Sequence, residues 1–206
     1  MASSTADTPV FVITGTSGEG KSTLARELVE RVPELELAIS ATTRPRRPGE
    51  QDGRDYWFVS EEEFDRRLQA GEFLEHVELP WGEGYRSGTL WSELDRIAAR
   101  GRSPLLEIET GGALAVRDRV AASVVVFVTA PSKGELERRL RARATESEGE
   151  IDERLDIAER QLALESEFHH TIVNDDLSRA LDELEGIVRG ELRAAGRIPA
   201  RDPSPH

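Results

Sequence analysis

The sequence predicts an α/β protein with a parallel sheet flanked by helices, and three observations support this prediction. Short apolar runs of buried-strand type alternate with helical patterns along most of the 206 residues. The run Val124–Val128 is apolar and largely β-branched, but far shorter than the roughly 20 residues of a membrane-spanning helix. The first strand-like run is followed by a glycine-rich loop and then by a helical pattern. Strands separated by helices pair in parallel, with right-handed connections.

Local patterns place the elements in chain order. The run from Pro9 to Thr14 is a buried strand, and the helix after the glycine loop carries Leu24, Leu28 and Val29. Ser60 and Glu63 form a capping box for a helix. Further strands are expected at 35–41, 56–59, 73–79, 104–108, 123–129 and 171–173, and further helices at 60–70, 90–100, 113–120, 131–143, 151–167 and from Asp176 onward.

Two segments interrupt the strand–helix alternation. The Pro- and Arg-rich stretch from 42 to 54 cannot be core and is typical of a binding loop. We expect the two inserted segments, 42–88 and 143–154, to lie near the carboxyl edge of the sheet, where open α/β sheets bind ligands. The expected division is a core of 9–41, 89–142 and 155–193, insertions at 42–88 and 143–154, and flexible ends at 1–8 and 194–206.

Composition excludes several classes of function. The formal net charge of −13 argues against broad adhesion to nucleic acid or anionic membranes, so we expect neither as a partner. The chain has no cysteine, which excludes disulfides, Cys-ligated metals and thiol nucleophiles. The N-terminal residues 1–7 are polar and lack the apolar segment of a signal peptide, so a cytoplasmic location is expected.

Residues 15–22 read GTSGEGKS and match the phosphate-binding pattern Gly-x4-Gly-Lys-Ser. The pattern lies between a strand and a helix, where glycines let backbone N–H groups surround a phosphate. Lys21 would reach the outer phosphates, and Ser22 would ligate Mg²⁺. Glu19 places a carboxylate inside this loop, and we expect its side chain to point to solvent. The motif predicts nucleotide binding without choosing among switches, motors and kinases.

A series of short motifs, in order, extends the pattern. They are SATTRPRRPGE at 40–50, GRDY at 53–56, FLE at 73–75, GT at 88–89, LEI at 106–108, PS at 131–132, RRLRAR at 138–143, RL at 154–155 and VNDD at 173–176. Over about residues 9 to 190 the chain resembles the guanylate kinase family, of bacterial type. The resemblance implies a P-loop nucleoside monophosphate kinase fold with a GMP-binding, β-rich insertion and a short lid. It also implies phosphorylation of GMP, and of dGMP, by direct in-line transfer from ATP, with release of ADP.

The resemblance assigns the acceptor residues, and their chemistry agrees. Arg44 and Arg47 with the Tyr56 hydroxyl suit a dianionic phosphate, although a solvated basic loop is the alternative. Guanine presents two N–H donors that a carboxylate accepts, a role that falls on Glu75 with Ser40 and Thr89 assisting. The full expected set is Ser40, Arg44, Arg47, Glu50, Tyr56, Glu75, Tyr85, Thr89, Glu107 and Glu109.

The resemblance also assigns the donor side. Lys21, Arg143 and Arg154 are the expected catalytic residues, because phosphoryl transfer needs charge neutralisation and the acceptor oxygen is already anionic. Arg138, Arg139 and Arg141 are expected to be helix-surface residues. Mg²⁺ is the expected cofactor, on Ser22 and, through a bound water, Glu107 or Glu109. The expected ATP-binding residues are Gly15, Ser17, Gly18, Gly20, Lys21, Ser22, Thr23 and Asn174, the last near the adenine.

Two stretches depart from the family pattern. Glu109 stands in place of an Asp and Gly111 in place of a Gln. Arg86 and Ser87 are inserted after Tyr85, and we expect Arg86 to add a further contact to the acceptor phosphate. Two other functions stay open: a non-catalytic interaction module of the same fold, and a kinase for another phosphorylated acceptor such as a ribose phosphate. The chain is expected to be a monomer or a homodimer.

Overall fold

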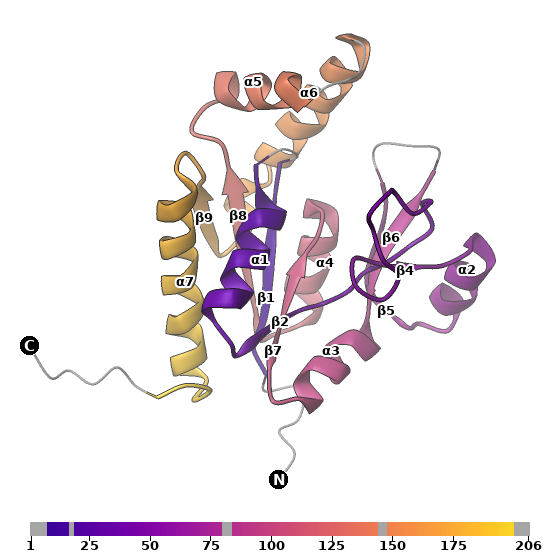
Figure 1. Ribbon diagram of the computed structural model, residues 1–206, viewed down its shortest axis with the longest axis vertical. Coiled ribbons are helices and arrows are strands. Elements are labelled where there is room, and N and C mark those ends of the chain that lie inside the picture. The colour runs from indigo at the N-terminus through magenta and orange to yellow at the C-terminus, as the bar shows by residue number, and fades with distance from the viewer. Residues whose placement is uncertain (1–7, 17–18, 80–83, 144–147, 200–206) are drawn as a thin grey trace, which may run out of the picture.

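The computed structural model of the chain describes residues 8–16, 19–79, 84–143 and 148–199. Its strands form two sheets that lie side by side (Figure 1). The larger sheet has five strands in the order β2-β7-β1-β8-β9, all parallel. These strands are β1 (Val10–Gly15), β2 (Leu35–Leu37), β7 (Ser103–Glu107), β8 (Ser123–Thr129) and β9 (His170–Val173). The predicted fold class, a parallel sheet flanked by helices, is confirmed.

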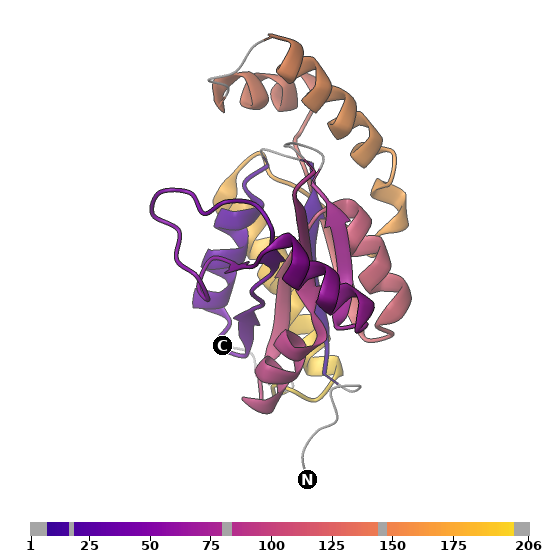
Figure 2. The same ribbon diagram turned by 90° about the vertical axis from the view of Figure 1, so that its right-hand side faces the viewer.

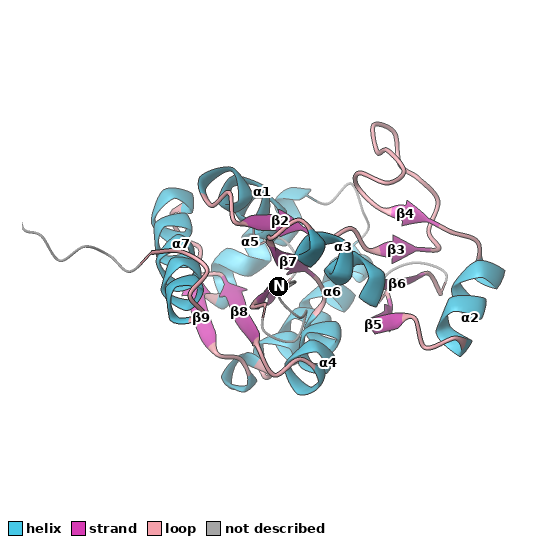
Figure 3. Ribbon diagram, turned by 90° about the horizontal axis from the view of Figure 1, so that it is seen from below, coloured by secondary structure: helices cyan, strands magenta, loops and turns pink. Residues whose placement is uncertain are grey.

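Alternation along the central strand divides the core into two layers. Phe11 and Ile13 pack against helices α1 (Lys21–Arg31) and α7 (Leu177–Ala194) on one face of the sheet. On the other face, apolar residues of the same strand pack with α3 (Trp91–Ala99) and α4 (Thr110–Arg119). Figure 3 shows the sheet between these two helix pairs. Because both faces are covered, the strands can be apolar throughout.

The second sheet has four strands in the order β4-β3-β6-β5. A small core of Ala41, Phe64, Phe73 and Leu90 joins it to helix α2 (Glu61–Gln69). The Ser60 hydroxyl accepts the backbone N–H of Glu63 at 3.2 Å, which is the cap that the sequence predicts. The strands are β3 (Ala41–Thr42), β4 (Trp57–Phe58), β5 (Phe73–Glu78) and β6 (Arg86–Leu90).

The strand expected at 35–41 is split between the two sheets. Strand β2 pairs with β7 in the central sheet, whereas β3 pairs with β4 and β6 in the second sheet. Between them, the buried Glu93 carboxylate accepts the backbone N–H of Ile39 at 3.1 Å and the indole N–H of Trp57 at 3.3 Å. Glu93 of helix α3 therefore fixes the stretch in which the chain passes from the first sheet to the second, and with it the position of the second sheet beside the first.

Helices α5 (Lys133–Arg143) and α6 (Glu148–Leu162) lie beyond the end of the central sheet where β1 finishes (Figures 1 and 2). Helix α6 begins three residues earlier than the helix expected at 151–167 and ends five residues earlier. A short 3-10 turn, Glu165–Glu167, follows α6. The sequence has Glu148 and Glu150 at this start, and glutamate is a residue type that favours the N-terminal turn of a helix. Much of the expected lid segment 143–154 is therefore helical.

The C-terminal end differs from the flexible tail expected from 194 onward. Ile198 packs against the core layer of α1 and α7, and the Arg197 guanidinium donates to the Gly101 carbonyl at 2.8 Å. Residues 195–199 thus continue the folded core. Helix α7 begins where the sequence predicts, since the Asp176 side chain accepts the backbone N–H of Arg179. In the part of the chain that the structure describes, no helix is long and apolar enough to span a membrane.

Candidate functional site

The glycine loop joins the end of β1 to the start of α1, as the sequence predicts. Gly15 has a φ of 135°, and a Cβ there would overlap the backbone of Val128 on the neighbouring strand. Gly20 has a φ of 77° and caps the helix, so both glycines are conformationally required. The Lys21 ammonium donates to the carbonyls of Gly15 and Thr16 at 2.8 and 2.6 Å. Its charge is therefore held over the loop opening.

The first turn of α1 faces the end of β7. The Ser22 hydroxyl donates to the Glu107 carboxylate at 2.6 Å, and Glu107 pairs in register with Ile13 of β1. A hydroxyl and carboxylates beside a phosphate-binding loop are hard oxygen donors that suit Mg²⁺. Within the described residues no three or more Asp, Glu or His side chains are grouped so that they could hold a metal ion, so a cation here would be completed by phosphate and water.

The expectation that Glu19 points to solvent is wrong. Its side chain is buried, and its carboxylate pairs with the Arg139 guanidinium of α5 at 2.8 Å. Arg139 also donates to the Asn174 carbonyl at 2.9 Å, and the Asn174 side chain donates to the Glu19 carbonyl at 2.7 Å. Burial raises the pKa of the Glu19 carboxyl, and the Arg139 charge opposes that rise. Arg139 is therefore a P-loop partner rather than the surface residue expected, and Asn174 supports the loop backbone.

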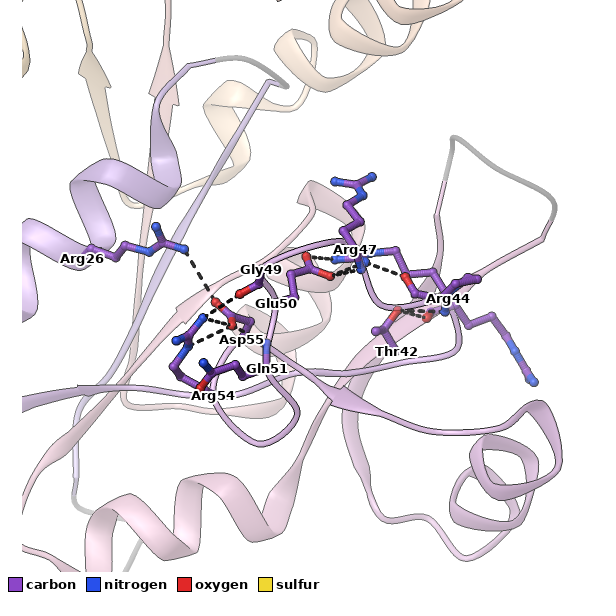
Figure 4. Close-up of polar contacts among 11 residues, drawn as sticks. Arg26, Thr42, Arg44, Arg47, Gly49, Glu50, Gln51, Arg54 and Asp55 are labelled. Carbon is purple, nitrogen blue, oxygen red and sulfur yellow. Dashed lines mark hydrogen bonds and ion pairs between the residues drawn. The ribbon is translucent and has the colours of Figure 1, made fainter.

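The Arg-rich loop of the second sheet is organised by an internal ion pair (Figure 4). Both terminal nitrogens of Arg44 donate hydrogen bonds to the Glu50 carboxylate, at 2.8 and 2.5 Å. The Cζ atom of Arg44 lies 4.8 Å from the centre of the Tyr56 ring. Hydrogen bonding to Glu50 raises the pKa of Arg44, and the same bonds lower the pKa of Glu50. Glu50 therefore positions Arg44, and Figure 4 shows the Arg47 side chain directed away from this pair.

Glu75 lies on β5 opposite Thr89 of β6. Its side chain is 2% exposed, and its Oε1 has no hydrogen-bond partner among the described residues. Burial raises the pKa of the Glu75 carboxyl, hydrogen bonds from Thr89 lower it, and the charge of Glu109 raises it further. The hydroxyls of Ser40 and Thr89 are 3.5 Å apart, so the three residues expected at the base edge lie together.

Glu109 is the N-cap of α4 but makes no capping hydrogen bond with its side chain. It accepts a hydrogen bond from the Gln161 amide of α6 at 2.9 Å. Burial raises the pKa of Glu109, and the Lys21 charge lowers it. Gln161, which sequence reasoning missed, thus links helix α6, whose first residues belong to the expected lid, to the acceptor region.

The expected contact of Arg86 with the acceptor phosphate is wrong. Its guanidinium pairs with Asp65 at 2.6 Å and with Glu61, and it lies 4.6 Å from the centre of the Phe64 ring. These partners belong to α2, on the side of the sheet away from the cleft, because neighbouring residues of a strand point to opposite faces. The next residue, Ser87, lines the cleft instead.

One cleft of about 280 Å³ brings the two halves of the site together. Residues expected from the sequence that line it are Gly20, Lys21, Ser22, Thr23, Ser40, Arg44, Arg47, Tyr56, Glu75, Glu107 and Glu109. Residues not expected there are Glu19, Thr42, Val77, Leu79, Ser87 and Ile108. Gly15, Glu50, Tyr85, Thr89 and Asn174 lie outside the lining set. Val77 of β5 and Leu79 just after it follow Glu75 at every second position, and Ser87 pairs with Val77. Strand alternation is therefore the signal that relates these residues to the cleft.

Four expected residues cannot be placed. Ser17 and Gly18 lie outside the described residues. Arg143 is the last residue of α5 and Arg154 lies in α6, but the side chains of both are outside the description. Their catalytic role remains a prediction.

The fold and the cleft define a class of protein, the P-loop nucleotide-binding α/β proteins that carry a second, smaller sheet. The phosphate-binding loop of the central sheet faces arginine and carboxylate side chains of that second sheet across one cleft. Such a site brings a nucleotide and a second anionic ligand into contact.

Comparison with known proteins specifies the class further. The sequence model of the family described as guanylate kinase matches residues 7–191. A guanylate kinase from Rubrobacter xylanophilus is 45% identical over 180 residues, 87% of this chain and 93% of that protein. One from Thermosynechococcus vestitus is 46% identical over 179 residues, 87% and 92% of the two chains. The crystal structure of guanylate kinase from Anaplasma phagocytophilum has a TM-score of 0.71 and 28% identity, and covers 94% of this chain and 97% of that one.

The chain therefore belongs to the guanylate kinase family. The resemblance predicted from the motifs is confirmed, and so is the prediction that the chain is an enzyme.

Proposed function

We propose that this chain transfers the γ-phosphoryl group of ATP to GMP, giving ADP and GDP. The observation that carries the proposal is the shared cleft, in which Lys21 and Ser22 face Arg44 and Glu75. The proposal extends to dGMP, because none of the roles assigned here involves the ribose 2′-hydroxyl. The relatives at 45 and 46% identity are named guanylate kinase, and this name agrees with the proposal.

The acceptor half recognises both ends of GMP. Arg44, already oriented by Glu50, binds the phosphate with Arg47 and the Tyr56 hydroxyl. Glu75 accepts the two N–H donors of guanine, which satisfies the oxygen that has no partner among the described residues. An adenine base presents an acceptor at the corresponding ring position, so it would meet a repulsive carboxylate. Selectivity for GMP follows from this difference.

The donor half neutralises charge during transfer. Lys21 contacts the outer phosphates of ATP, and Arg143 and Arg154 reach the transferring group when the α5–α6 segment closes. Ser22 and, through water, Glu107 or Glu109 would hold Mg²⁺, which lowers the charge repulsion between the phosphates when bound. The attacking phosphate oxygen of GMP is already anionic, so no side chain has to remove a proton from it.

The decisive experiment measures ADP release from ATP and Mg²⁺ with GMP, dGMP, AMP, UMP, CMP and ribose phosphates as acceptors. We expect selective turnover with GMP and dGMP, and loss of turnover in Lys21→Ala. Preference for a different acceptor would overturn the role of Glu75. If no acceptor gave ADP release although GMP bound measurably, the proposed reaction would be overturned. Turnover near wild type in Lys21→Ala would refute the donor site.

A further inference from the structure

Two consecutive glycines, Gly111 and Gly112, lie in the first turn of α4. Glycine weakens a helix, so two in succession call for a reason. Neither glycine has a positive φ, so the backbone conformation at both positions is open to alanine. The explanation must therefore be the space around each Cα atom.

The two positions differ sharply in that space. A Cβ on Gly111 would meet its nearest atom, Cγ1 of Val77, at 3.7 Å, an ordinary contact. A Cβ on Gly112 would lie 3.0 Å from Cδ of Glu75 and would overlap the carboxylate oxygen Oε2. The Glu75 carboxylate thus occupies the volume that a side chain at position 112 would fill. Its side chain is almost wholly enclosed, so few other positions are open to it.

We infer that Gly112 is a positioning residue for guanine recognition: its missing side chain sets where the Glu75 carboxylate lies, and thereby sets the preference for GMP. The inference rests on the proposed function, because it requires Glu75 to accept the base N–H donors. The carboxylate lies against the first turn of α4, whose N-terminal N–H groups favour negative charge. Gly112 therefore allows this approach at the cost of a weaker helix.

Gly112→Ala tests the inference, with Gly111→Ala as a matched control on the same helical turn. Both changes add one methyl group and both favour the helix, but only the methyl group at position 112 would overlap Glu75, whereas the one at 111 makes an ordinary contact with Val77. We expect Gly112→Ala to raise KM for GMP about tenfold or more, because the methyl group would displace the Glu75 carboxylate, and a shift of ~1 Å in a positioning group can reduce activity about a hundredfold. KM for ATP should stay within about twofold, and Gly111→Ala should leave both constants within that range.

A second readout separates positioning from general damage. Inosine monophosphate lacks the exocyclic amine of guanine, so it loses one of the two donors that Glu75 accepts. Gly112→Ala should reduce the ratio of kcat/KM for GMP to that for inosine monophosphate, and Gly111→Ala should not. An unchanged KM for GMP, or equal losses for ATP and GMP, would overturn the inference. If the wild-type chain did not phosphorylate GMP at all, the proposed function would fail first.

A double variant guards against misfolding. Glu75→Asp shortens the side chain by one methylene and leaves room for a methyl group at position 112. Adding Gly112→Ala to Glu75→Asp should therefore change KM for GMP by less than about twofold, which is non-additive behaviour typical of residues in contact. If Gly112→Ala alone does not fold, recovery of folding in the double variant supports the contact. A double variant that also fails to fold overturns it.

Discussion

Glu19 at the P-loop and Glu75 in the second sheet are both enclosed, with 1% and 2% of their surface exposed, but their surroundings differ. Glu19 pairs with the Arg139 guanidinium at 2.8 Å. Each carboxylate has an Oε1 without a hydrogen-bond partner among the described residues, but these residues provide an ion pair only for Glu19. Burial is the first cause of a raised pKa at both carboxyls, but an arginine offsets it only at Glu19.

The difference shows how a structural carboxylate can be told from a recognition carboxylate. A buried charge is unfavourable unless a counter-charge or hydrogen bonds compensate it. The protein itself compensates Glu19, which therefore ties the P-loop to α5. Glu75 receives hydrogen bonds from Thr89 but has no counter-charge among the described residues, and its free Oε1 is left to a ligand with N–H donors. Burial alone does not separate the two residues, whereas the presence of a counter-charge does.

The strongest test removes the acceptor at Glu75. Glu75→Gln replaces one carboxylate oxygen by an NH₂ donor, which faces a donor of guanine. We expect kcat/KM for GMP to fall about a hundredfold, because a buried donor–donor contact costs ~2–3 kcal/mol. KM for ATP should remain within about twofold. Steady-state kinetics with each substrate varied in turn measures both values.

The matched control is Glu78→Gln on the same strand, where the side chain is exposed. It makes the same chemical change and should leave GMP kinetics unaltered. If Glu75→Gln lowered the efficiency with ATP as much as that with GMP, the residue would have a structural role. Unchanged GMP kinetics would remove Glu75 from recognition altogether.

The next test breaks the pair at Glu19. Arg139→Met keeps much of the side-chain volume but leaves a buried carboxylate without its counter-charge. We expect the free energy of unfolding to fall by about 2 kcal/mol, less than for a fully enclosed pair, because water reaches part of Arg139. For a chain of this size, the expected drop in Tm is ~4–8 °C. Thermal and urea unfolding of the purified protein measure the change.

Glu19→Gln in the same background is the control, since it removes the uncompensated charge. The double variant should recover most of the lost stability, which gives a positive coupling energy for the pair. Equal stabilities of the single and double variants would mean that the ion pair contributes nothing. The comparison between the two carboxylates would then lose its basis.

Local signals in the sequence predict much of this structure. The apolar run before Gly15 and the helix after Gly20 place the P-loop, and Ser60 and Asp176 mark helix starts through hydrogen bonds within three residues. The base-edge group of Glu75, Ser40 and Thr89 follows from family motifs rather than from any physical pattern. The geometry that joins these residues is set by antiparallel pairing of β5 and β6.

What the sequence does not predict depends on long-range contacts. Glu19 and Arg139 are 120 residues apart, and nothing near either one indicates that they pair. The direction of Arg86 is not predictable from its position alone, because the face that a strand residue takes depends on register, and the register shifts between Phe73 and Glu75 on the partner strand. The contact of Gly112 with Glu75 is likewise invisible in the sequence, where a glycine shows only that a side chain is absent.

The last test is a pH dependence that ranks the two carboxylates. Burial raises the pKa of Glu75 above its ordinary value of 4.5, so the folded protein binds this proton more tightly than the unfolded chain does. Stability from this group is therefore complete below pH ~4.5 and is lost as the pH rises through the raised pKa. Glu75→Gln should match the wild type near pH 4.5 and become more stable toward pH 7, by at most ~1.4 kcal/mol per pH unit.

Glu19→Gln should show the same sign but a smaller gain, because Arg139 compensates the charged form and Gln loses that partner. Urea unfolding of both variants and the wild type between pH 4.5 and 8 measures the two differences. A larger gain for Glu19→Gln than for Glu75→Gln would reverse the ranking. In that case the Arg139 counter-charge would not be what distinguishes the P-loop carboxylate from the one in the second sheet.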